Sequence, residues 1–201
     1  MKGTLLKDLK NLKGQLLYYA FLVVVFFVVG ALSGNLYFYV GLSMFCGAVA
    51  PVSAIAYDEK DNWDKFALAS GVSRKELAAA RYLLGLLIFI PIWALSFVFF
   101  AIPAFRTQEN LFAVLMFGGM GLIVTDVILP LVFRIGVEKA RAVYLLVVLA
   151  VMLLSVGAAS FIELIGGDPA FIGACLLFAA GVAGVFVSFV VSVGIYKKKD
   201  F

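Results

Sequence analysis

The residues of this chain that could do chemistry are few, and they are mostly charged rather than nucleophilic. The sequence has no histidine, the commonest general base and metal ligand. It also lacks the G-x-x-x-x-G-K-[ST] loop that cradles the phosphates of ATP. Cys46 and Cys175 each lie in an apolar segment, where they are expected to be small buried hydrophobes rather than a disulfide. Neither a catalytic site nor a metal site is therefore predicted.

The longest polar stretch runs from Tyr57 to Tyr82, and apolar segments lie on either side of it. Hydrophobic residues make up 65% of the chain and charged ones 14%, against about 45–50% and about 25% in soluble domains. Such a chain cannot cover itself with polar surface in water. We predict an all-α, polytopic membrane protein, a single domain over residues 1–201 with no cleavable signal peptide.

Six segments are long enough to cross a bilayer, which takes about 20 apolar residues. They cover residues 16–32, 36–56, 77–104, 111–133, 142–165 and 170–196. Short connections, such as the acidic 166–168, alternate with the charged ranges 57–76 and 134–141. Glycine and proline recur in the second, third and fourth segments. They either let helices bend and approach closely or reflect ordinary membrane-helix composition.

The cationic residues predict which way the chain faces. All of them except Arg106 fall on one side of the six-span topology: Lys2, Lys7, Lys10, Lys13, Lys60, Lys65, Arg74, Lys75, Arg81, Arg134, Lys139, Arg141, Lys197, Lys198 and Lys199. Positively charged loops stay in the cytoplasm. Both termini and the two charged ranges are therefore predicted to be cytoplasmic, in a plasma membrane.

The N-terminal residues 1–15 show the pattern of a short amphipathic helix. Leu5, Leu6, Leu9 and Leu12 recur at helical spacing, and lysines fall between them. Such a helix lies in the headgroup plane with its lysines toward anionic lipid. Thr4 is a candidate N-cap. The alternative is a disordered basic tail.

The polar stretch contains a second short helix. Trp63, Phe66, Ala67 and Ser70 recur on one face, so a helix is predicted over residues 58–70. Asp58 or Asp61 is its candidate N-cap, and Gly71 ends it. Ser73 with Glu76 three residues later forms a capping box that begins the third span. The second span, this short helix and the capped third span together predict a rigid elbow.

The charge of this helix favours a protein partner over lipid. A helix on a membrane surface is usually net basic, whereas residues 57–70 have four acids and two lysines. Net negative charge is unfavourable at an anionic leaflet. Docking to a soluble partner is thus the better interpretation, and a merely solvated helix is the alternative.

The string AYDEKDNWDKFALASGVSRKELAAARYLLG resembles the first cytoplasmic loop of a known family. This family comprises the small six-helix bacterial permease subunits of type-2 ATP-binding-cassette exporters, including those of the phenol-soluble-modulin type. PLVF and GVEKAR, at 130–133 and 136–141, resemble its second cytoplasmic loop, and LLKDL, at 5–9, its N-terminal helix. The departure is Ser70-Gly71, where such loops commonly have Leu-Pro.

The resemblance implies a division of labour. The 57–76 range would be a coupling loop whose helix docks on a cytoplasmic ATPase subunit, and this chain would have no ATPase site. The docking residues would be Asp58, Glu59, Asp61, Trp63, Asp64, Lys65 and Phe66. ATP and Mg would be bound by the partner, with no cofactor in this chain. A second permease, identical or paralogous, would complete the transporter within membrane lipid, and no nucleic-acid partner is implied.

Asp126 is the one carboxylate well inside a predicted span. An intramembrane carboxylate is costly and suggests function. It would line a transport pathway or pair across the bundle, or else reach water or Arg81. For the whole chain we predict an exporter permease that moves amphipathic or hydrophobic cargo, with peptides implied by the resemblance. The alternatives are a substrate-binding membrane subunit of a vitamin importer and, least favoured, an intramembrane enzyme.

Overall fold

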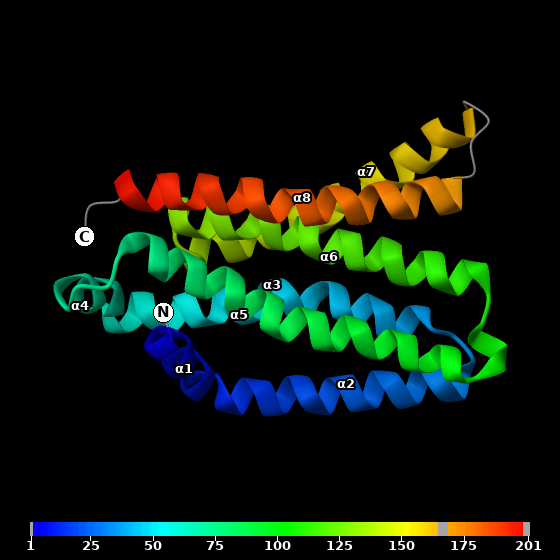
Figure 1. The fold of residues 1–201 in the computed structure, drawn as a ribbon, viewed down its shortest axis with the longest axis horizontal. Coiled ribbons are helices and arrows are strands. Elements are labelled where there is room, and N and C mark those ends of the chain that lie inside the picture. Colours follow the sequence, from blue (N-terminus) through cyan, green and yellow to red (C-terminus); the bar gives the residue numbers. More distant parts are fainter. Residues whose placement is uncertain (1, 165–168, 199–201) are drawn as a thin grey trace.

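A computed structural model describes residues 2–164 and 169–198, and every regular element in those ranges is a helix (Figure 1). Six of these helices are long and apolar enough to cross a membrane. They are α2 (Lys13–Ser33), α3 (Tyr37–Asp61), α5 (Arg74–Ala94), α6 (Gln108–Ile135), α7 (Val137–Leu164) and α8 (Pro169–Lys198). The all-α fold with six spans is thus confirmed. The predicted connection 166–168 lies outside the described residues.

Shorter helices complete the chain. α1 (Lys2–Asn11) precedes the first span, and α4 (Trp63–Ala69) lies between α3 and α5. The third span ends in two 3-10 helices, η1 (Leu95–Ala101) and η2 (Pro103–Phe105), so it is not α-helical throughout. In Figure 1, α1, α4 and the last turn of α8 lie at one end of the bundle. We call this end, with the α6–α7 turn, the charged end.

The predicted second loop, 134–141, is almost entirely helical. α6 ends at Ile135 and α7 begins at Val137, so Gly136 alone makes the connection. Its φ of +83° is in the left-handed region, which glycine adopts without steric cost. Its N–H donates to the carbonyl of Val132 and closes the last turn of α6. The charges of this range therefore lie on helix ends rather than on a flexible loop.

α6 is the central helix, packed most extensively against α8 and α3. It approaches α8 through glycine: a Cβ at Gly119 would lie 2.6 Å from the backbone of Leu177, and one at Gly181 would lie 2.8 Å from Leu122. Helices without an intervening side chain can pack backbone to backbone. Close approach thus explains these glycines, whereas a Cβ at Gly41 would meet open space.

The outer helices expose rows of large apolar side chains. α2, α7 and α8 contribute most of them: Leu17, Phe21, Val24, Leu32, Leu145, Leu149, Leu153, Phe186, Val187 and Val190. In water such faces would drive aggregation. Hydrocarbon is the solvent they fit, and the length of the six spans agrees with it.

The α6–α8 contact leads to a stability prediction. Gly119→Ala places a methyl group against the α8 backbone, so we expect a loss of about 1–3 kcal/mol in the free energy of unfolding. Gly194→Ala, on α8 where the added methyl meets nothing within 4 Å, is the matched control and should cost nothing. Thermal unfolding of the detergent-solubilised variants measures both. Equal melting temperatures would contradict the close approach of α6 and α8.

Candidate functional site

The elbow, defined here as Asp58–Glu76, is built from two helix ends and the short α4. α3 continues to Asp61, and Asn62 turns the chain with a φ of +52°. The predicted single helix over 58–70 is therefore wrong, because it is split at Asn62. The N-cap prediction is wrong as well: Asn62, not Asp58 or Asp61, precedes α4, and its side chain makes no capping bond. Asparagine is one of the few residues that tolerates this left-handed conformation.

The exit from the elbow follows the prediction. Gly71 has a φ of +87°, as expected for a glycine that ends a helix. Ser73 Oγ accepts from the Glu76 N–H at 3.2 Å, and the Glu76 carboxylate accepts from the Ser73 N–H at 3.1 Å. The capping box is thus confirmed as the start of α5. It fixes the direction in which the third span leaves α4.

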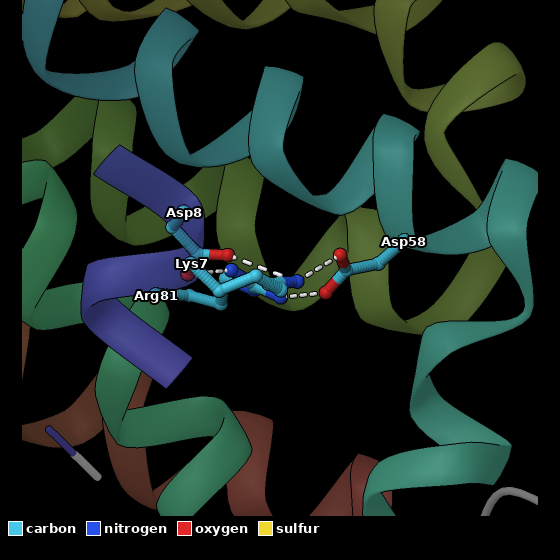
Figure 2. A network of polar contacts seen from close by, with 4 residues as sticks. All are labelled: Lys7, Asp8, Asp58 and Arg81. Atoms are coloured by element: carbon cyan, nitrogen blue, oxygen red, sulfur yellow. Dashed lines mark hydrogen bonds and ion pairs between the residues drawn. The ribbon is translucent and has the colours of Figure 1, made fainter. Parts of the chain in front are cut away.

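A buried ion-pair network joins the elbow to two other helices (Figure 2). Arg81 of α5 is 2% exposed, and its guanidinium donates to Asp8 of α1 and to Asp58 of α3. Lys7 donates to Asp58 and lies 3.1 Å from an Asp8 oxygen. We call these four residues the Arg81 network. Its two cations and two anions balance, so the buried charges compensate one another.

The network also explains the position of α1. Asp8 is 1% exposed, and Lys7 lies half-buried with its Nζ 4.5 Å from the centre of the Trp63 ring. Burial lowers the pKa of Lys7, and the neighbouring Asp8 carboxylate opposes that shift. A helix is confirmed at the N-terminus, but α1 ends at Asn11, short of the predicted residue 15, because α2 begins at Lys13; Lys7 is half-buried against the bundle rather than turned toward lipid as expected. Thr4 lies inside α1 and is not its N-cap.

The seven predicted docking residues divide into two groups. Asp58 is 3% exposed and belongs to the network, and Trp63 is half-buried beneath Lys7. Glu59 accepts from the Val137 N–H at 3.1 Å, which ties the elbow to the start of α7. The outward group is made of the exposed side chains Asp61, Lys65 and Phe66, whereas the half-buried Asp64 turns toward Tyr196 of α8 and Lys7. The docking role stays a prediction, and the outward group together with the exposed Glu59 offers a surface for it in this conformation.

Asp126 lies on α6 and does not pair with Arg81. It is 8% exposed, and its carboxylate oxygens have no hydrogen-bond partner among the described residues. The carboxylate rests against Gly184 of α8. Its own backbone carbonyl accepts from Ser188 at 2.5 Å, and Ser188 also bonds the hydroxyl of Tyr82. Hydrogen bonds therefore link Tyr82 of α5, Ser188 of α8 and the Asp126 backbone of α6, while the Asp126 carboxylate beside them has no partner among the described residues.

Sequence reasoning missed the role of Arg81 and its partners. The available signal was an arginine followed directly by the apolar run of a span, which is costly without acidic partners. The partners are distant in sequence: Asp8 is 73 residues away and Asp58 is 23. Local periodicity cannot name such partners.

Comparison with known proteins now identifies the class. A family model described as ABC-2 family transporter protein matches residues 3–197. The chain therefore belongs to this family and is an ABC-2 type permease, a multi-pass membrane subunit of an ABC transporter. Family members are transport subunits that generally lack an ATPase site, and an ABC ATPase is their general partner. The search of curated proteins and the search of solved structures each found no match.

Removal of the central cation tests the network. Arg81→Gln leaves two buried carboxylates facing one lysine, so the free energy of unfolding should fall by about 3–5 kcal/mol. Arg81→Lys should lose less, because one ammonium can still bond one of the acids. Arg134→Gln, at an exposed arginine, is the control and should change stability by less than about 0.5 kcal/mol. Denaturant unfolding in detergent measures all three, and equal stability of Arg81→Gln and Arg134→Gln would contradict the network.

Proposed function

We propose that this permease is the membrane subunit of an exporter and that a cytoplasmic ATPase drives it through the elbow. The observation that carries the proposal is the division of the elbow into two faces. Phe66 and Lys65 are exposed on the outer face. Asp58, on the inner face, is bonded to Arg81. A partner that bound to the outer face and moved would therefore also move the elbow, which Asp58 already ties to the bundle.

The outer face suits a protein better than lipid. Phe66 is 61% exposed, and its ring stands 5.3 Å from that of Trp63, which gives α4 an aromatic knob. Aromatic side chains that enter a partner's pocket supply much of the energy of protein interfaces. The exposed Asp61 near it would be repelled by anionic headgroups. An apolar cleft rimmed by cations on the ATPase would fit this surface.

The contacts of the elbow suggest how a push on α4 would spread. Through Asp58 it would reach Arg81 on α5 and Asp8 on α1. The next residue on α5, Tyr82, bonds Ser188 and Ser192 of α8 at 2.5 Å and 2.8 Å. Ser188 in turn holds the carbonyl of Asp126 on α6. Tilting of α3 and α5 would thus displace α8 against α6, where Asp126 would line or gate the pathway.

The cargo would be amphipathic or hydrophobic, and peptides are the class that we favour. At the end opposite the elbow, the described connections are short, namely Gly34–Leu36 between α2 and α3 and Arg106–Thr107 before α6. Cargo would then enter from the cytoplasm or the inner leaflet. A second permease, identical or paralogous, would complete the path. ATP and Mg would bind to the ATPase subunits.

The proposed orientation places the charged end in the cytoplasm of a bacterium. The cations on the elbow side of the topology outnumber Arg106, the one on the other side, and the translocation machinery retains positive loops inside. Both termini would share that compartment, because the six spans return the chain to the side on which it began. This orientation is what brings α4 within reach of a cytoplasmic ATPase.

Truncation of the aromatic knob tests the docking proposal. Phe66→Ala should weaken binding to the ABC ATPase that partners this permease roughly 30-fold, the loss of a side chain worth about 2 kcal/mol. Phe186→Ala, at an exposed apolar position of α8, is the control and should bind as the unmodified chain does. Co-purification through a tag on the ATPase, followed by titration, gives the affinities. Unchanged affinity of Phe66→Ala would remove the coupling role of α4.

Thiol labelling tests the orientation. In a background without Cys46 and Cys175, we expect a membrane-impermeant maleimide to label Gln108→Cys on intact cells. Lys60→Cys should react only after the cells are permeabilised, since the elbow would face the cytoplasm. Both positions are exposed in the fold, so access depends on the membrane alone. Labelling of Lys60→Cys from outside would overturn the proposed topology.

A further inference from the structure

Two adjoining cavities lie between α3 and the start of α7, and Arg141 lines both of them. The outer cavity, of about 540 Å³, opens at the charged end beside Lys60 and Lys139. The inner one, of about 290 Å³, lies deeper in the bundle beside Tyr144 and Ile128. Neither cavity involves the Arg81 network or the outer face of α4. The proposed docking of an ATPase therefore does not account for them.

The outer cavity has an excess of available positive charge. Lys60, Lys139 and Arg141 are exposed, and their side chains make no hydrogen bond or ion pair within the described ranges. Of the two acids on the same wall, Glu59 already accepts a hydrogen bond from the N–H of Val137. Among the described residues, Glu138 is the only acid of this wall that accepts no hydrogen bond. The mouth is therefore suited to an anion.

The inner cavity is a narrow, mainly apolar slot, and the lining residue Tyr144 adds a polar group. Val49 and Val52 of α3 face Ile128 of α6 across it. The Tyr144 hydroxyl is buried and has no hydrogen-bond partner among the described residues. A buried hydroxyl without a partner is costly, so a ligand that reached it would relieve that cost. The slot thus combines apolar walls with a buried hydroxyl at one of its lining residues.

The depth of the two cavities matches the two parts of a lipid. Tyr144 lies seven residues after Val137, which is about 10 Å along the helix from the start of α7. The outer cavity would therefore lie at headgroup level, and the inner one at the boundary with the acyl chains. Cationic pockets between transmembrane helices are known to hold acidic headgroups.

We propose that these joined cavities bind an anionic phospholipid. Arg141 and Lys139 contact its phosphate, the hydroxyl of Tyr144 donates to an oxygen near the glycerol, and the start of an acyl chain fills the slot beside Val52 and Ile128. The bound lipid would fill the space between α7 and α3 at the charged end of the bundle. This proposal requires only a membrane-embedded permease, and it stands whether or not α4 binds an ATPase.

Lipid titration of the full chain in neutral detergent tests the proposal. The probes are phosphatidylglycerol and phosphatidylcholine with identical acyl chains, and native mass spectrometry reports the bound lipid. We expect phosphatidylglycerol to bind at least fivefold more tightly. Arg141→Gln should weaken it about fivefold, and Tyr144→Phe about threefold. Arg134→Gln removes an equal charge from the same end but outside both cavities, and it should leave binding unchanged.

Four results would overturn the lipid site. The first is equal binding of the two lipids, and the second is equal loss in Arg141→Gln and Arg134→Gln, which would indicate a diffuse charge effect. The third is displacement of phosphatidylglycerol by inorganic phosphate at the same concentration, because the site would then recognise a bare anion. An acidic amphipathic peptide that binds through Arg141 while the lipid does not would also contradict the proposal and indicate a cargo site.

Discussion

The pairing of the buried Arg81 guanidinium is the constraint on which the charged end depends. A guanidinium at 2% exposure is stable only if acids reach it, and no acid lies near it on its own helix. Asp58 must therefore come from α3 and Asp8 from α1. The same bonds explain why α1 is ordered, since a ten-residue helix is marginal by itself. Leu5 and Leu9 then pack beside Leu12 in the core shared with α2 and α3.

In the proposed mechanism, the tie between α1, α3 and α5 would let the elbow act as a lever rather than as a loop. The chain turns at both ends of α4, at Asn62 with a φ of +52° and at Gly71 with a φ of +87°. In general, a packed interface converts a small shift into helix motion when it has two discrete arrangements and does not deform continuously. At the glycine contact between α6 and α8, the two backbones meet without an intervening side chain. The unpartnered Asp126 lies on that contact, where a shift of α8 would change its surroundings.

The parts of this structure that could be predicted from sequence are those set by local physics. Span length and hydropathy placed the six helices, and Ser73 with Glu76 defined the start of α5, because each signal is complete within a few residues. The end of α3 was missed because the second span was predicted to stop at Ala56, where the charged residues begin, whereas α3 continues through them to Asp61 and turns only at Asn62. The partners of Arg81 were missed because α1 and α5 meet only in the folded chain. For the same reason Asp58, predicted as a docking residue, is found inside.

The claim that the Arg81 network carries motion from the elbow to the bundle can be measured without knowing the cargo. Spin labels at Ser33 and Gln108, at the opposite end, report the distance between α2 and α6 in the assembled complex before and after trapping with ATP and vanadate. Asp8→Asn should bind the ATPase normally yet show a smaller distance change. Lys10→Gln, an exposed lysine of the same helix, should show the full change. A full-sized change in Asp8→Asn would contradict the central role of the network.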